Sequence, residues 1–358
     1  MQVDVHLMPS LPGSTVELDR AMFERMLSDP ALQADQWKIY PTQVVPWTII
    51  KKWHEEGSYV PYPTETLYEL LMRVKAAVHP WIRLNRVVRD IPIQYVSGGL
   101  DVPNLREDLL TGMARRGMFC SCIRCREVGA AAPLPSTVQL MHRGYEASGG
   151  SEHFLSFEAR GARRGVTETS SPSDLLCGFL RLRLPDLAYC AAAPEEELPF
   201  PELRGAALVR EVHVYGQLIA TSDKTGAASQ HTGLGRRLLA EAEYRARAHG
   251  CRVVAVIAGI GSRDYYRKSG YALHPGEGRY MIKPLGRFAP GWHRAAAADP
   301  AARRGFLAAL LALVAVACCW LVTAACPAEL ATGAARGRAA AVPAWLDAPA
   351  ACLAALVG

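Results

Sequence analysis

The 358-residue sequence lacks the marks of a secreted protein. Its first residues, 1–5, contain neither the basic nor the apolar region of a signal peptide. Its ten cysteines do not follow the regular spacing of a disulfide framework, because many of them gather at 120–125 or in an apolar segment at 318–352. Both absences predict a protein of a reducing compartment.

The sequence also has no strong excess of charge of either sign. Its formal net charge of +6 permits an anionic partner without establishing one. A hydrophobic content of 50% over 358 residues is sufficient to bury the cores of about two domains.

One stretch, 230–271, combines the local signals of an anion-binding site. Gly233 and Gly235 stand directly before an amphipathic helical pattern, so unpaired backbone N–H groups at the positive end of a helix can bind a pyrophosphate. An apolar strand pattern at 253–257 and an aromatic turn at 265–271 follow. This order resembles the acetyl-CoA site of the GNAT acetyltransferases, whereas two glycines alone also make a simple tight turn.

Residues 1–100 alternate between strand and helix patterns. The sequence predicts strands at 3–8, 37–40 and 81–88, and helices at 18–27, 47–56 and 64–78. Such alternation is typical of an α/β sheet or barrel. Because three or four strands do not close a barrel, we expect a partial barrel.

Several blocks of the sequence resemble the Elp3 family, the catalytic subunits of Elongator. The blocks are 6–13, 38–42, 86–92, 124–129, 145–150, 178–183, 210–216 and 230–271. The resemblance covers roughly residues 1–285 and implies a radical-SAM barrel joined to a GNAT domain. It further implies modification of C5 of the wobble uridine, uridine-34, in tRNA, with acetyl-CoA as the donor.

The sequence differs from this family because it lacks the cysteine motif on which radical chemistry depends. The family uses a [4Fe–4S] cluster and S-adenosylmethionine, and the cluster requires a C-x3-C-x2-C motif that does not occur here. We therefore expect a family member without its front half: a truncated chain, a chain whose cluster half is a separate polypeptide, or a protein that has lost radical chemistry.

The resemblance up to residue 285 and the composition beyond it together predict a division of the chain into successive parts. These are the C-terminal part of a radical-SAM-like barrel (1–100), a linker with a Cys cluster (101–137), a GNAT domain (138–285), a linker (286–304), a transmembrane tail anchor (305–328) and an Ala-rich tail (329–358).

The resemblance also implies which residues contact acetyl-CoA. The expected contacts are Val212, His213, Val214, Gln230, His231, Thr232, Gly233, Leu234, Gly235, Arg236, Tyr265 and Tyr266. In the GNAT layout, the backbone of the strand at 212–214 polarises the thioester carbonyl. Tyr265 or Tyr266 would protonate the leaving thiolate, although adjacent aromatic residues are more often part of a core.

Two further catalytic residues are predicted outside the glycine-rich stretch. Glu211, with His213 on the same strand face, is a candidate proton acceptor, and a partly buried structural role fits the pattern equally well. Lys38, in the second strand pattern, is a candidate only through the family resemblance.

A metal site is predicted at Cys120, Cys122 and Cys125. The spacing C-x-C-x-x-C favours thiolate ligation, and zinc takes four ligands, so a fourth must come from elsewhere: His142, Cys177 or Cys190. The alternatives are linker cysteines that bind nothing, or an iron–sulfur cluster, for which the spacing is wrong in the radical-SAM type.

Basic residues concentrate between the barrel part and the linker. They are Arg83, Arg86, Arg89, Arg106, Arg115, Arg116, Arg124 and Arg126. Guanidinium groups bind phosphate oxygens well, so these residues predict a contact with the anticodon region of tRNA, with a solvated charged face as the alternative. The resemblance further implies other Elongator subunits as partners and a homodimer.

The C-terminal segment 305–328 contains no charged residue over 24 positions and follows Arg303 and Arg304. About 20 apolar residues span a bilayer, so this segment predicts a membrane tail anchor with the rest of the chain on the cytoplasmic face. Resemblance to some protist family members implies the mitochondrial outer membrane. The alternative is a cytoplasmic protein with an Ala-rich extension.

The leading hypothesis is therefore an Elp3-like tRNA uridine-34 acetyltransferase. Two other classes remain open: a GNAT acetyltransferase that modifies lysine or another amine without radical chemistry, and a non-catalytic tRNA-binding subunit.

Overall fold

The computed structural model describes residues 2–102, 104–128, 138–159, 175–194, 200, 203–215, 233–274 and 280–286. All of these lie in one compact unit, Met1–Ala298, and the second unit, Asp299–Gly358, lies outside the described residues. No helix in the described ranges has the length and apolar character needed to cross a bilayer. The predicted anchor at 305–328 is not among the described residues, so it stays a prediction.

The N-terminal part contains a parallel three-stranded sheet in the order β1-β2-β3. Its strands are β1 (Asp4–Leu7), β2 (Gln36–Ile39) and β3 (Arg83–Arg86), which confirms the three strand patterns in shorter form. The helices are α1 (Val16–Ser28), α2 (Ile49–Glu55) and α3 (Thr64–Ala77), with short 3-10 turns at η1 (Pro30–Leu32) and η2 (Ile93–Tyr95). These parallel strand–helix units agree with the predicted partial barrel.

The two faces of this sheet differ in chemistry because strand side chains alternate. Trp37, Ile39 and Leu84 point to the face that packs in one core with α1 and α3. On the opposite face, Lys38 Nζ lies 2.8 Å from Asp4 Oδ2. The N-terminal sheet therefore has one buried face and one polar face.

The segment expected to be a linker is built into this core. It contains α4 (Leu105–Arg115) and α5 (Ile123–Arg126). Leu109, Met113, Cys120 and Cys122 are buried in the same hydrophobic cluster as Trp37. The Cys-rich segment is thus part of the N-terminal core rather than a loose connection.

The second sheet has the order β4-β5-β6-β7-β8-β10-β9. Its strands are β4 (Val138–Ala147), β5 (Gly150–Ala159), β6 (Leu175–Pro185), β7 (Ala207–Val214), β8 (Val253–Ile257), β9 (Ala272–Leu273) and β10 (Tyr280–Pro284). The helices are α6 (Leu187–Ala192), α7 (Leu234–His249) and α8 (Arg263–Arg267), with a 3-10 turn at η7 (Ile260–Ser262). Neighbouring strands are antiparallel except β7 and β8, which are parallel and joined by the α7 crossover.

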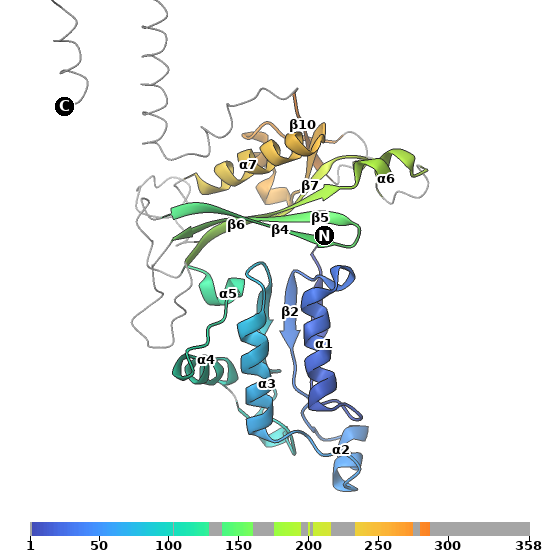
Figure 1. Cartoon of the computed structure of the whole chain (residues 1–358), viewed down its shortest axis with the longest axis vertical. Coiled ribbons are helices and arrows are strands. Elements are labelled where there is room, and N and C mark those ends of the chain that lie inside the picture. The colour runs from blue at the N-terminus through green and yellow to red at the C-terminus, as the bar shows by residue number, and fades with distance from the viewer. Residues whose placement is uncertain are drawn as a thin grey trace, which may run out of the picture. The chain divides into compact units, whose positions relative to one another are not determined.

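Helix α7 covers one face of this sheet (Figure 1). Leu238, Leu239 and Ala242 recur at helical spacing and are buried against Leu180 and Val209 of the sheet. Each fully buried leucine contributes about 1.5–3 kcal/mol relative to an exposed one. This packing fixes where the N-terminus of α7 points.

The opposite face of the second sheet meets the N-terminal part through buried ion pairs. Arg210 donates two hydrogen bonds of 2.7 Å to the carboxylate of Asp35, which directly precedes β2. Burial opposes ionisation of Asp35, but the hydrogen bonds from Arg210 and the charge of Arg181 hold its pKa below the usual value. Nearby, Arg126 and Arg143 pair with the buried Glu158.

Candidate active site and metal centre

Strand β7 separates from β8 halfway along its length. Ala207, Leu208 and Val209 pair with β8, but the following residues, up to Val214, pair only with β6. The register on the β6 side shifts between Arg181 and Leu182, which leaves Arg210 as the extra residue of a β-bulge. Among the residues that the structure describes, no strand pairs with the second edge of β7 between Arg210 and Val214, and we call this the open edge.

The open edge offers backbone donors. Tyr215 donates its N–H to Cys177 O of β6 at 2.9 Å. N–H groups alternate in direction along an antiparallel strand. The N–H groups of Val212 and Val214 therefore both point away from β6, opposite to that of Tyr215, and lie on the open edge. Such donors can polarise a carbonyl group.

The N-terminus of α7 approaches this edge through two glycines. Gly233 is the N-cap with φ of 73°, a left-handed conformation that favours glycine, and no side chain caps the helix. A Cβ on Gly235 would overlap the Tyr265 hydroxyl and lie 3.6 Å from Val214 Cγ2. Glycine at 235 thus allows α7, β7 and Tyr265 to meet around one space.

That space is a cavity of about 440 Å³. It is lined by Val212, Val214, Gly233, Gly235, Arg236, Ser262, Tyr265 and Tyr266. Seven of these were predicted as coenzyme contacts, and the structure brings them together. Ser262 was not predicted, since only its place in the turn before Tyr265 could have indicated it. Leu234 is buried in the core, and Gln230, His231 and Thr232 lie outside the described residues.

The two tyrosines occupy different positions in the cavity wall. Tyr265 is 39% exposed and Tyr266 is 8% exposed, with their rings edge to face at 5.2 Å. Burial raises the pKa of Tyr265, which the charge of Arg236 partly offsets, and burial raises the pKa of Tyr266 to about 12. Both hydroxyls are therefore protonated at neutral pH, and Tyr265 is the more accessible proton donor.

The other predicted catalytic residues lie away from this cavity. Glu211 accepts a 2.9 Å hydrogen bond from Arg181 Nε, in the buried ion-pair cluster on the opposite face of β7. His213 stacks on Phe179, with ring centroids 6.0 Å apart, and burial among such rings lowers its pKa. Lys38 lies on the polar face of the N-terminal sheet. Neither Glu211, His213 nor Lys38 lines the cavity beside Tyr265.

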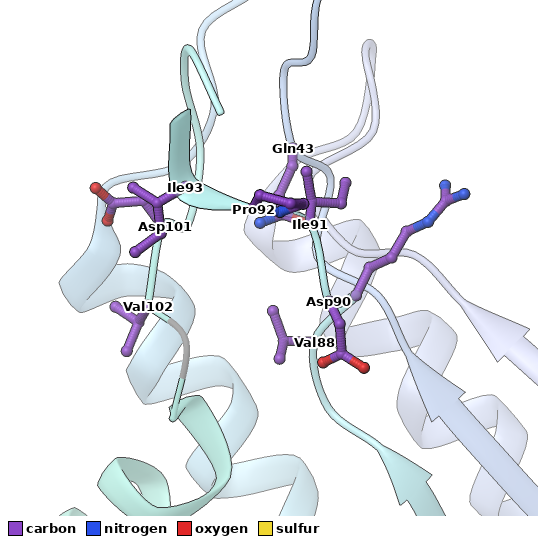
Figure 2. A pocket seen from close by; sticks show the side chains of 9 residues that line it. Gln43, Val88, Asp90, Ile91, Pro92, Ile93, Asp101 and Val102 are labelled. Carbon is purple, nitrogen blue, oxygen red and sulfur yellow. The ribbon is translucent and has the colours of Figure 1, made fainter. Parts of the chain in front are cut away.

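A second cavity, of about 280 Å³, lies beyond the carboxyl ends of β2 and β3. Figure 2 shows Asp101 and Val102 on one side of it and Val88 and Asp90 on the other. The rest of its lining is Gln43, Arg89, Ile91, Pro92 and Ile93. Ligand sites of open parallel sheets and barrels form at this end of the strands.

Arginines of the predicted tRNA surface do not all reach solvent. The Arg126 side chain is 2% exposed and pairs with Glu158 at 2.9 Å. The prediction that Arg126 contacts a phosphate is therefore wrong. Arg83 bonds Glu127 and Tyr215, and Arg106 donates to Leu84 O. Five members of the set are exposed: Arg86, Arg89, Arg115, Arg116 and Arg124. Arg86 and Arg116 are each paired with an acidic residue.

The three predicted metal ligands lie together. The Sγ atoms of Cys120, Cys122 and Cys125 are within 4.8 Å of one another, and no fourth His, Cys, Asp or Glu joins them in the described part of the chain. Clustered thiolates fit zinc or another thiophilic ion.

The proposed fourth ligands are placed elsewhere. His142 stacks on His153, Cys177 is buried in the core under α7, and Cys190 lies in α6. None of the three contributes an atom to the group of ligand atoms that lie within 4.8 Å of one another. The prediction that one of these three residues is the fourth ligand is therefore wrong.

The three thiols of this cluster form hydrogen bonds with one another and so change one another's pKa. Burial opposes ionisation of Cys122, but hydrogen bonds from the other two thiols and the charge of Lys75 hold its pKa well below the usual value. The hydrogen bond to Cys122 in turn raises the pKa of Cys120 well above the usual value.

This chain is similar to known proteins over most of its length. Residues 34–114 match the radical SAM C-terminal domain family. The tRNA uridine(34) acetyltransferase of Dehalococcoides mccartyi (strain CBDB1) is 42% identical over 289 residues, which are 80% of this chain and 58% of that protein. Elongator complex protein 3 of Homo sapiens is 40% identical over 289 residues, which are 79% of this chain and 49% of that protein.

A solved structure is also similar to the described fold. The archaeal Methanocaldococcus infernus Elp3 with an N-terminal deletion matches with a TM-score of 0.65 and 36% identity, over 80% of this chain and 63% of that one. The chain spans about half the length of the curated relatives it matches. Over about 80% of its length, this chain is similar to Elongator complex protein 3 and to the tRNA uridine(34) acetyltransferases.

Proposed function

We propose that this chain carries the acetyl-CoA-dependent part of a tRNA uridine-34 acetyltransferase. The observation that carries the proposal is the open edge of β7, which faces the N-terminus of α7 and Tyr265 across one cavity. This arrangement supplies donors for a carbonyl, a positive helix end for phosphates and an acid for a leaving group.

Each part of the cavity has a separate role in this proposal. The N–H groups of Val212 and Val214 bind and polarise the acyl carbonyl. The first turn of α7 and Arg236 bind the pyrophosphate of the coenzyme. Tyr265 holds its proton at neutral pH and delivers it to the departing sulfur. Positioning and electrostatic stabilisation thereby account for most of the expected rate enhancement.

The proposal that the substrate is a tRNA rests on the names of the relatives and on the sequence that they share with this chain. The cavity beyond β2 and β3 and the polar sheet face that carries Lys38 are candidate places for the wobble base. A [4Fe–4S] cluster and S-adenosylmethionine would supply the radical in the complete family enzyme, but this sequence contains no C-x3-C-x2-C motif to hold the cluster. The proposal for this chain is therefore limited to opening the thioester.

The remaining proposals concern partners and location. Other Elongator subunits are proposed partners, because relatives carry the name Elongator complex protein 3. Attachment to the cytoplasmic face of a membrane rests on the apolar segment 305–328 alone. A homodimer stays a prediction from the family resemblance.

The decisive experiment measures CoA thiol release from acetyl-CoA by the purified chain. We expect release to rise when tRNA with uridine at position 34 is added, and not with the same tRNA carrying cytidine there. Release without any response to tRNA, together with acetylation of a lysine peptide, would favour the amine acetyltransferase. Binding of acetyl-CoA with no release under either condition would favour a non-catalytic subunit.

A further inference from the structure

Lys75 is a charged residue enclosed in the N-terminal core. It lies near the end of α3 and its side chain has no exposed surface. Within the described ranges, its Nζ has no hydrogen-bond partner. A buried ammonium group without a partner is strongly destabilising, so its persistence requires a compensating negative charge.

The buried carboxylates do not supply that charge, because each already has another partner. Asp35 and Glu152 accept from Arg210, Glu158 accepts from Arg143, and Glu243 accepts from Lys283. Asp19 accepts from Ser10 N and Ser14, and Glu241 pairs with Arg245. Among the described residues, the groups left near Lys75 are the thiols of the Cys cluster.

The position of Lys75 relative to those thiols supports this reading. Cys120 and Cys122 share a hydrophobic core with Leu71 and Val74, which flank Lys75 on α3. Lys75 lies close enough to act electrostatically on Cys120, Cys122 and Cys125 alike. An otherwise apolar core therefore encloses one cation and three potential anions.

The charge of Lys75 is opposed only when thiols of the cluster are ionised: by one thiolate in the metal-free cluster, or by the metal-bound cluster. Three neutral thiols leave the Lys75 charge unopposed. Three thiolates and one divalent ion carry a net charge of −1, which Lys75 cancels. A fourth thiolate would leave the buried site negative again, in agreement with the absence of a fourth cysteine from the described cluster.

We infer that Lys75 is the buried counter-charge of a divalent metal site with three thiolate ligands and a neutral fourth ligand. Lys75 does not bind the metal in this arrangement. Its positive charge stabilises the negative metal–thiolate group without contact with the metal. Substitutions of residues that act in this way typically change metal affinity by about 10–100-fold. The inference is independent of acyl transfer.

The experiment measures Zn²⁺ affinity by competition with a chromophoric chelator, and the thermal unfolding midpoint with and without Zn²⁺. For Lys75→Met we expect affinity about 10–100-fold weaker than in the unmodified chain. We also expect the metal-free variant to unfold at an equal or higher temperature, because an apolar side chain beside neutral thiols replaces a buried charge. Lys52→Met, at an exposed lysine of α2, is the matched control and should change neither value.

A double-mutant cycle separates the charge effect from packing. Two thiolates and a divalent ion are already neutral, so Lys75→Met should weaken Zn²⁺ binding much less in a Cys125→Ser background. Lys75→Arg, which keeps the charge, should retain most of the affinity and provides a second test if Lys75→Met does not fold. Equal Zn²⁺ affinity in Lys75→Met and the unmodified chain, or an equal loss in both backgrounds, would overturn the inference. Failure of the unmodified chain to bind Zn²⁺ or Co²⁺ would do the same.

Discussion

Arg83 donates a hydrogen bond of 2.8 Å to the hydroxyl of Tyr215, the residue directly after β7. The same guanidinium contacts Glu127 at 3.0 Å. Together with the pair between Arg210 and Asp35, this bond holds β7 on the side opposite the cavity. Strand β7 is thus positioned from the N-terminal part by Arg83, the first residue of β3, and by Asp35, which directly precedes β2.

Removal of the Tyr215 hydroxyl tests this positioning. Tyr215→Phe keeps the ring and the Arg83–Glu127 pair but loses one partly buried hydrogen bond, worth about 1 kcal/mol of stability. We expect a several-fold lower rate of CoA release with little change in acetyl-CoA affinity, since the cavity lining is intact. Tyr189→Phe, at a tyrosine that is 59% exposed, is the control. An unchanged rate in Tyr215→Phe would show that this bond does not position the strand.

Gly235 gives a prediction in which stability and binding change in opposite directions. Gly235→Ala lies inside α7, where alanine favours the helix by roughly 0.5–1 kcal/mol. Its new Cβ overlaps the hydroxyl of Tyr265, so the Tyr265 side chain must shift and the wall of the cavity changes shape. We expect acetyl-CoA binding, measured by calorimetry, to weaken by about tenfold or more. Gly261→Ala, which meets no atom within 4 Å, should leave binding unchanged.

Tyr265 is expected to act as an acid in its protonated form. Tyr265→Phe should lower kcat by about 10²-fold or more with a small effect on KM, the range typical of general acid catalysis. Because burial raises the pKa of Tyr265 above 10.0, the contribution of its proton should persist through neutral pH and be lost only at higher pH. Steady-state kinetics across pH checks both points. A larger loss in Tyr266→Phe would reassign the acid to the more buried ring.

The lowered pKa of Glu158 predicts how the stability of the fold depends on pH. Burial would raise its pKa, but hydrogen bonds from Arg143 and Ser156 and the charge of Arg126 lower it from 4.5 to about 2. A lowered pKa means that the ionised form stabilises the fold above pH 4.5 and that this contribution is lost as pH falls toward 2. The linked stabilisation is on the order of 3 kcal/mol.

Denaturant unfolding of Glu158→Gln checks this dependence. The variant should be less stable than the unmodified chain at neutral pH, and the gap should close between pH 4.5 and pH 2. Glu55→Gln, at an exposed glutamate, serves as the control. A gap that stays constant over this interval would assign the loss to packing rather than to ionisation.

The features that sequence could predict are those encoded locally. Gly233, Gly235 and the Tyr265–Tyr266 pair stand at helix and turn boundaries that a short window reveals, and the structure brings all four to one cavity. The strand patterns of the N-terminal part were visible in the same way. Each signal depends on neighbours within a few residues.

The features that sequence could not predict depend on distant contacts. Arg126 was predicted to contact a phosphate, but it pairs with Glu158 of the second sheet. No residue near Arg126 in the sequence indicates that its side chain is buried. The bulge at Arg210 follows from the register between β6 and β7. The fourth metal ligand was sought among His142, Cys177 and Cys190 because sequence shows residue types but not which sheet carries them.

The pair between Asp35 and Arg210 spans 175 positions of the chain. At a synthesis rate of roughly 5–20 residues per second, the ribosome needs on the order of 10–35 s to add the second partner after the first. Throughout that interval the N-terminal third exists as nascent chain without the guanidinium that its acidic residue will bind. The ion pair between Asp35 and Arg210 can therefore form only after β7 has left the exit tunnel.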